Sequence, residues 1–310
     1  MTVSRARAPE RAPDRPGPGA LPDVLLRRLN VKVRRRIDGL IPGDFLSMLL
    51  GSGTEIAQIR RYEPGDDVRR IDWSVTARMQ EPHVRMQVAE RALTTWTLID
   101  TSSSMTFGTQ ERRKLDVAEG VLLAMSHLAT RGGNRLGIMT FGGPGPVVVP
   151  PSRDRMGPMH VLRKLRGEPV AEGTPSSSLV ETLDRAARIC RTRGVVVVVS
   201  DFRGAHDFKQ PLCHLAQRHH VLAVEIGDPR EQELVDVGTV WMTDIETGRQ
   251  LRVDTHSDKL RARFARAAER ERAEVRRLIR GCGCDHVVLS TQGDWLRRFA
   301  DHLAKRHIRR

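Results

Sequence analysis

Short apolar runs alternate along this chain with segments whose apolar residues recur at helical spacing. Runs typical of buried strands are found at residues 95–99, 136–141, 147–149, 195–199, 221–226 and 287–289. After the first run, one helical stripe is formed by Leu115, Ala118, Leu122, Met125 and Ala129. This alternation predicts an α/β fold with a doubly wound, mostly parallel sheet that is covered by helices on both faces.

The remaining pattern divides the chain into three parts. Further helices are predicted near residues 153–166, 177–192, 208–218, 256–280 and 293–306, and a β-hairpin is predicted at residues 238–254, before the long basic helix. Residues 1–24 are rich in Pro, Arg, Ala and Gly and carry few large apolar groups, so we expect a disordered basic tail. Residues 25–90 would form an N-terminal segment, and residues 91–310 the α/β domain.

The first strand is followed by oxygen-bearing side chains at alternate positions. Asp100 ends the apolar run, and Ser102 and Ser104 follow it. Because successive side chains of an extended segment point to opposite sides, these three would share one side of the loop. Oxygen ligands of modest charge suit Mg²⁺ or Mn²⁺. The alternative is an ordinary turn or helix cap, which also favours Asp and Ser after a strand.

Two other segments carry similar side chains. Ser200 and Asp201 follow five consecutive valines, as expected at the carboxyl edge of a parallel sheet. Thr174 lies in a Gly-Thr-Pro turn that precedes three serines and a predicted helix. Together with Asp100, Ser102 and Ser104, Thr174 and Asp201 are the five candidate ligands of a single metal ion.

The order and spacing of these residues resemble the metal-ion-dependent adhesion site of the von Willebrand factor A fold. Upstream, residues 60–73 (RRYEPGDDVRRIDW), with Ala77 and Arg78, resemble the signature of the bacterial family called domain of unknown function fifty-eight. The resemblance extends from about Gly51 to the C-terminus. Members of this family are similar to A-domains and are typically encoded beside MoxR-type AAA+ ATPases, so the resemblance implies such an ATPase as a partner.

The resemblance also implies how a metal would be held. In A-domains the residues matching Ser102 and Ser104 bind the ion directly, and the residue matching Thr174 approaches from its own loop. Those matching Asp100 and Asp201 act directly or through water. Mostly neutral ligands leave the ion with affinity for an incoming carboxylate, so a Glu or Asp of a protein partner would complete the coordination.

The signature segment has a second interpretation. It carries Asp66, Asp67, Arg69, Asp72 and Arg78 around Trp73. These charges could serve a function, or they could form a paired network that fastens the N-terminal segment to the sheet, with Trp73 buried. We expect the second arrangement.

Positive charge is concentrated in three stretches of the chain. The net charge is +14, and residues 1–36 hold ten Lys or Arg against three acids, residues 259–280 nine against three, and residues 296–310 six against one. The rest, including the candidate site, is slightly acidic. With twelve aromatics in the chain, side chains for base stacking are scarce. A solvated basic face, or contact with an acidic protein or a nucleic acid, would each explain the basic stretches.

Cysteine usage and apolar content bear on location. The cysteines at 190, 213, 282 and 284 do not form a framework of the secreted type, which favours a reducing compartment. Cys282 and Cys284 offer too few ligands for a closed zinc site, so we expect incidental thiols at a helix end. No apolar run approaches the ~18 residues that a bilayer span needs. We therefore expect a cytoplasmic protein with no membrane contact.

The residues that two classes of enzyme would require are missing from this sequence. Position 102 is Ser where a haloacid-dehalogenase-like phosphatase places its second Asp, and there is no Walker loop for ATP hydrolysis. We therefore expect a non-enzymatic, metal-dependent protein-binding module, acting as adaptor or partner of a MoxR-type ATPase. Nucleic-acid binding by the basic termini is the alternative, followed by a metal-dependent hydrolase.

Overall fold

The structure is a computed structural model of the 310-residue chain. It describes residues 58–86, 93–108, 112–131, 134–143, 146–153, 157–159, 161–162, 177–204, 206–243 and 250–307. The predicted tail at residues 1–24, most of the segment that precedes the signature, and Thr174 lie outside these ranges.

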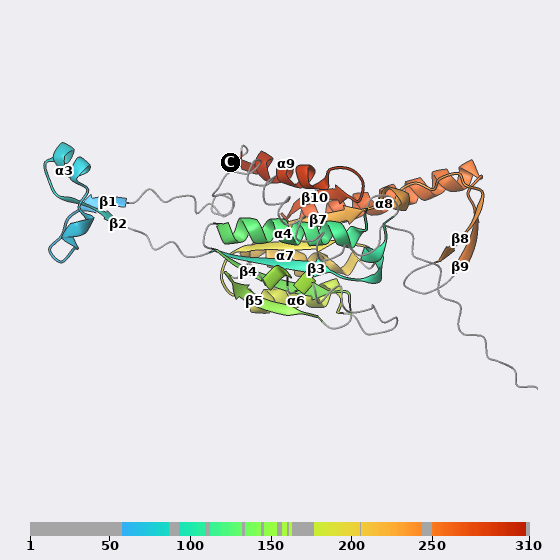
Figure 1. The fold of residues 1–310 in the computed structure, drawn as a ribbon, viewed down its shortest axis with the longest axis horizontal. Coiled ribbons are helices and arrows are strands. Elements are labelled where there is room, and N and C mark those ends of the chain that lie inside the picture. The colour runs from blue at the N-terminus through green and yellow to red at the C-terminus, as the bar shows by residue number, and fades with distance from the viewer. Residues whose placement is uncertain are drawn as a thin grey trace, which may run out of the picture.

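A six-stranded sheet forms the centre of the α/β domain (Figure 1). Its strands are β3 (Thr94–Asp100), β4 (Arg135–Phe141), β5 (Val148–Ser152), β6 (Val195–Ser200), β7 (His220–Gly227) and β10 (Asp285–Ser290). Their order is β10-β7-β6-β3-β4-β5, and every neighbouring pair is parallel except β4 and β5. The predicted doubly wound, mostly parallel sheet is confirmed.

Helices cover both faces of this sheet. One face packs against α4 (Lys114–Arg131) and α9 (Trp295–His307), and the other against α6 (Leu179–Ile189), α7 (Lys209–Arg218) and α8 (Asp258–Gly281). Five helices that the apolar periodicity predicted are thus present. At the predicted helix near 153–166, the described residues 157–159 and 161–162 are helical.

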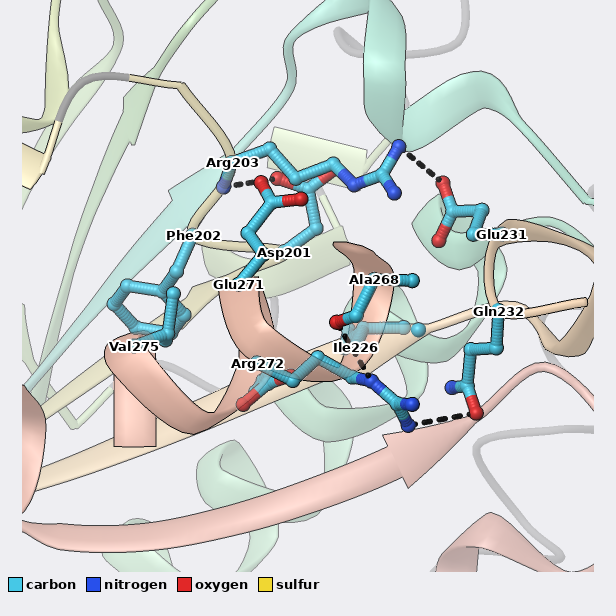
Figure 2. A pocket seen from close by; sticks show the side chains of 12 residues that line it. Asp201, Phe202, Arg203, Ile226, Glu231, Gln232, Ala268, Glu271, Arg272 and Val275 are labelled. Atoms are coloured by element: carbon cyan, nitrogen blue, oxygen red, sulfur yellow. Dashed lines mark hydrogen bonds and ion pairs between the residues drawn. The ribbon is translucent and has the colours of Figure 1, made fainter. Parts of the chain in front are cut away.

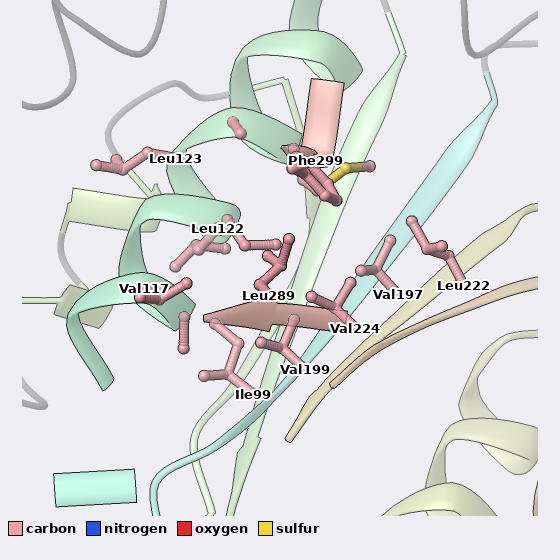
Figure 3. Close-up of a cluster of buried hydrophobic side chains, with 14 of the residues drawn as sticks. Ile99, Val117, Leu122, Leu123, Val197, Val199, Leu222, Val224, Leu289 and Phe299 are labelled. Carbon is pink, nitrogen blue, oxygen red and sulfur yellow. The ribbon is translucent and has the colours of Figure 1, made fainter. Parts of the chain in front are cut away.

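The valine run of β6 shows why a central strand is apolar throughout. Val197 and Val199 point into the core beneath α4 and α9, where Figure 3 shows them beside Leu122 and Phe299. Val196 and Val198 belong to the second core, on the opposite face. Because side chains alternate across a strand and both faces are covered, all five valines of β6 are buried, and a polar residue in place of any of them would cost stability.

A β-hairpin precedes α8, as predicted. Its strands β8 (Thr239–Thr243) and β9 (Gln250–Asp254) pair antiparallel. Residues 244–249, between these two strands, are outside the described residues. Trp241 and Leu251 on this hairpin are exposed.

The signature segment folds into a small unit of its own. Strands β1 (Gln58–Arg61) and β2 (His83–Met86) pair antiparallel, and between them lie a 3₁₀ turn, η1 (Val68–Arg70), and helix α3 (Trp73–Met79). Asp72 caps α3 by accepting hydrogen bonds from two backbone N–H groups at its start.

The expectation that Trp73 is buried under a charge network is wrong. Trp73 is 71% exposed, and α3 has no buried residue. The carboxylates serve local purposes instead, since Asp66 binds Arg60 at 2.6 Å and Asp67 caps η1. The ion pairs of Arg60 and Arg61 that the described residues show also join residues of this segment.

The cysteine expectation also needs correction. Cys213 of α7 and Cys282, which ends α8, form a disulfide across 69 positions of sequence, whereas Cys190 and Cys284 are free and buried. Cys282 is therefore not an incidental thiol, and cysteine usage does not favour a reducing compartment. Within the described ranges, no helix combines the length and apolar character that a membrane span requires.

Candidate functional site

Two neighbouring strands end in carboxylates where the strand order of the sheet reverses. From β3 the chain proceeds to β4 on one side, whereas β6 lies on the other side, so β3 and β6 flank the switch point of the fold. Loops leaving the carboxyl ends of such strands diverge and open a crevice, which is where doubly wound sheets bind ligands. Asp100 ends β3, and Asp201 follows β6.

The carboxylate of Asp100 is fixed by both strands. It is 5% exposed. Its Oδ1 accepts a hydrogen bond from the N–H of Ser102 at 2.9 Å, and its Oδ2 accepts one from the hydroxyl of Ser200 at 2.6 Å. These contacts hold the carboxylate in one orientation at the base of the crevice.

The two predicted serine hydroxyls lie together. Oγ of Ser102 and Oγ of Ser104 are 3.0 Å apart. The reason differs from the one predicted, because Ser102 begins a 3₁₀ turn, η2 (Ser103–Thr106), and the chain does not continue as a strand. The hydroxyl of Ser104 also hydrogen bonds to Asp201. Four of the five predicted ligands are thus brought together, and Thr174 is outside the described residues.

The segment that follows Thr174 reaches the same place. The N–H of Gly142, just after β4, donates to the carbonyl of Ser177 at 3.0 Å. Gly142 has φ +77°, and a Cβ there would lie 2.6 Å from Oδ1 of Asp100. Glycine is therefore required for β4 to pass beside Asp100. The Gly-Gly dipeptide after an apolar run is the feature of the sequence that could have indicated this close approach.

A buried lysine, which sequence reasoning missed, belongs to the same cluster. Lys114 begins α4 and is fully buried. Its Nζ lies 2.6 Å from Oδ2 of Asp201 and 2.6 Å from Oε1 of Glu231. Glu231 is in η4 (Pro229–Glu231) and also contacts Arg203 at 3.3 Å, as Figure 2 shows. Nothing in the sequence around Lys114, which lies beside an apolar helical stripe, indicates that this lysine is buried.

Electrostatics distinguish the two aspartates. Burial raises the pKa of Asp100 to about 6, and the charge of Asp201 adds to this rise. Burial would also raise the pKa of Asp201, but the ammonium of Lys114 lowers it below its ordinary value. Asp201 is therefore ionised and paired, while Asp100 is a buried carboxylate with hydrogen bonds but no cation of its own.

The donor set fits a hard divalent cation. Two serine hydroxyls and a carboxylate whose charge lacks a counter-ion offer oxygen ligands at one place, the type that Mg²⁺ and Mn²⁺ prefer. Over the described ranges, no group of three or more His, Cys, Asp or Glu side chains could hold a metal. A site here would therefore depend on hydroxyl oxygens. Asp201, with Oδ2 on Lys114 and Oδ1 on the N–H of Arg203, is better placed to act through water.

The pKa of Asp100 predicts a pH effect. Its folded value of about 6 exceeds its ordinary value of 3.8, so the folded protein binds the proton more tightly than the unfolded chain does. The resulting stabilisation is present below pH ~4 and is lost as the pH rises through ~6, a change of about 2–3 kcal/mol in the metal-free protein. Urea unfolding in EDTA between these limits measures it.

Asp100→Asn is the matched control for that measurement. Wild type and variant share every other titrating group, so the difference between their unfolding free energies isolates residue 100. We expect this difference to change with pH in the stated direction. Parallel pH profiles for the two proteins would contradict the assignment.

A pocket adjoins the cluster on the side of α8 (Figure 2). It lies between β7, η4 and α8, and Asp201 and Arg203 are on its wall. Farther from the cluster, Arg272 donates to Gln232 at 2.7 Å. Arg203, whose side chain is 41% exposed, thus lies on the wall that this pocket shares with the cluster.

Comparisons with known proteins agree on the family. Residues 58–274 match the family described as "Protein of unknown function DUF58". The chain is 42% identical over 283 residues to "Uncharacterized protein Rv1480" of Mycobacterium tuberculosis, which covers 91% of this chain and 88% of that protein.

Two solved structures are similar to part of this chain. The protein BatB from Bacteroides thetaiotaomicron is 12% identical with a TM-score of 0.44, over 71% of this chain and all of that one. The SpRpn10 VWA domain is 16% identical with a TM-score of 0.37, over 69% of this chain and 95% of that one. At these identities the likeness concerns the fold alone. From the family match and the mycobacterial relative together, it follows that this chain belongs to the DUF58 family.

Proposed function

We propose that this protein is a metal-dependent protein-binding module. In this proposal Ser102, Ser104 and Asp100 hold Mg²⁺ or Mn²⁺, with Thr174 from its own loop, and Asp201 acts through water. The bound ion supplies a Lewis-acidic position for a carboxylate of a protein partner. The observation that carries the proposal is the buried Asp100 carboxylate, which lies beside two converging hydroxyls and has no cation partner among the described residues.

The residues of the chain have distinct parts in this proposal. Ser200 and the N–H of Ser102 orient Asp100. The ammonium of Lys114 is shared by Asp201 and Glu231, and Arg203 provides a second cation for Glu231. Among the described residues this leaves Asp100 as the uncompensated carboxylate near the hydroxyls. A cation held by neutral hydroxyls and one charge keeps affinity for a further anion. This makes the site suited to docking an acidic side chain of another protein.

We propose binding and not catalysis for two reasons. Residue 102 is serine, so the general acid of an aspartate-based phosphatase is missing. The amine of Lys114 donates to two carboxylates, each at 2.6 Å, so it is directed at these partners and not toward a substrate. The partner that we propose is a MoxR-type AAA+ ATPase, because the resemblance of the signature at residues 60–73 implies one.

Ser102→Ala tests the metal site. Removing one hydroxyl ligand is expected to weaken Mg²⁺ binding about tenfold, equivalent to about 1.4 kcal/mol, in a calorimetric titration. Ser103→Ala is the matched control, because it removes the same group one residue away, outside the hydroxyl pair. We expect that control to bind Mg²⁺ as the wild type does.

The partner is tested separately. A MoxR-type ATPase should be retained by the immobilised chain in Mg²⁺ and released by EDTA, and Ser102→Ala should retain less of it than Ser103→Ala. Retention by the wild type in EDTA that equals its retention in Mg²⁺ would show that docking does not need the ion. Failure to bind Mg²⁺ at all would reject the metal site itself.

A further inference from the structure

A groove runs along the open edge of the sheet, on the side of β10. In the strand order β10 is terminal and pairs only with β7, so its outer edge has no strand partner among the described residues. A groove of about 520 Å³ follows this edge, with α8 and α9 as its two walls. Its floor includes His286, Val287 and Val288 of β10.

The walls of this groove are basic. Its cationic side chains are Arg276 and Arg280 of α8 and Arg297, Arg298 and Lys305 of α9, all exposed. They face two carboxylates, Asp294 and Asp301, and the one ion pair between groove residues joins Arg297 to Asp301 at 4.0 Å. In the described part of the chain, Arg276, Arg280, Arg298 and Lys305 make no ion pair. An anionic ligand would thus meet cations that have no other counter-ion.

A buried polar atom of α9 also lies at this groove. Nε2 of His302 is buried and has no hydrogen-bond partner within the described residues. His286, by contrast, is paired with Glu225 at 2.8 Å and is not available. An unpaired buried nitrogen is costly unless a ligand or water satisfies it. It lies at the same groove, beside the open backbone of β10.

We propose that this groove binds an acidic polypeptide segment in extended conformation, which adds a strand to the sheet beside β10. An edge strand offers alternating N–H and C=O groups, and an added strand satisfies them. The basic walls select acidic side chains. Six residues of β10 correspond to about 20 Å of extended partner.

Other occupants fit the groove less well. A second copy of this chain, pairing edge to edge, would bring two sets of these cations together, and like charges oppose such pairing. A nucleic acid would match the charge, but no Phe, Tyr or Trp lines the groove for base stacking. The open strand edge can pair with the N–H and C=O groups of a peptide backbone, and a sugar-phosphate backbone lacks these groups.

The groove is separate from the candidate metal site. Its lining shares no residue with the cluster of Asp100, Ser102, Ser104 and Asp201. The proposal therefore does not depend on the proposed function. Peptide binding measured in EDTA reports on the groove alone, because EDTA removes the ion that binding at the candidate metal site would require.

The test uses a fluorescent peptide of about ten residues with alternating Glu and Val, titrated with the full chain in EDTA at low salt. We expect Arg280→Glu combined with Arg298→Glu to weaken binding at least tenfold. The matched control is Arg263→Glu combined with Arg266→Glu, which changes the charge equally on exposed residues of α8 outside the groove. We expect that control to lose less than threefold.

Two further probes separate strand addition from simple charge attraction. Peptides N-methylated at odd or at even positions keep every side chain but lose alternate backbone donors. We expect at least one of them to bind tenfold more weakly. Binding of both methylated peptides as tight as that of the unmodified peptide, equal loss in the two double variants, or tighter binding of single-stranded oligothymidine of matched charge would each overturn the proposal. No detectable binding of the peptide would also overturn it.

Discussion

Replacing Lys114 with methionine is expected to lower the free energy of unfolding by about 3–5 kcal/mol. The side chains are similar in size, so the change removes mainly the charge. Lys114 is fully buried and lies 2.6 Å from both Asp201 and Glu231. Without the ammonium, Asp201 becomes a buried carboxylate with no counter-ion, which is the most costly consequence of breaking a buried ion pair.

Urea unfolding, followed by circular dichroism, measures this effect. Lys209→Met is the control, because Lys209 is an exposed lysine at the start of another helix. It should change stability by less than about 0.5 kcal/mol. Lys114→Met combined with Asp201→Asn should recover part of the loss, since it removes the unpaired charge. A loss below 1 kcal/mol in Lys114→Met would contradict the role assigned to this lysine.

Reduction of the disulfide is expected to lower the free energy of unfolding by up to about 4 kcal/mol, according to the chain-entropy description of cross-links. Cys213 and Cys282 are 69 positions apart, so their bond restricts a long loop of the unfolded chain. It also joins α7 to the end of α8. The measurement compares unfolding with and without a reductant.

Cys213→Ser provides the control for reduction. Its stability should match that of the reduced wild type and should not respond to the reductant. Burial raises the pKa of the free thiols Cys190 and Cys284 to about 12, so they should resist alkylation while the protein is folded. If the unreduced wild type exposed four alkylatable thiols on unfolding, the disulfide would be absent.

The hydrophobic pattern was sufficient to predict the architecture. Strands buried on both faces must be apolar throughout, and covering helices need one apolar stripe, so β6 and α4 were recognisable from their sequences alone. The pattern failed for Trp73, because an aromatic residue was assumed to be buried. Nothing local indicates that the carboxylates around it cap their own turns.

The candidate site was accessible to sequence reasoning in part. Asp100, Ser102 and Ser104 are close in sequence, so their proximity in space follows from local geometry. The carboxyl ends of parallel strands share an edge, which brought in Asp201. Lys114 and Gly142 were missed. Their roles arise from contacts with residues that are distant in sequence.

Three features were determined by the sequence alone, because each depends on neighbouring residues. They are the alternation of strands and helices, the faces that these elements bury, and the type of ligand at the ends of two strands. Only the tertiary structure decided which distant groups meet. It joined Cys213 to Cys282, placed a lysine between Asp201 and Glu231, and brought two basic stretches to the walls of one groove beside β10. Such meetings depend on the packing of helices on the sheet, which no short segment encodes.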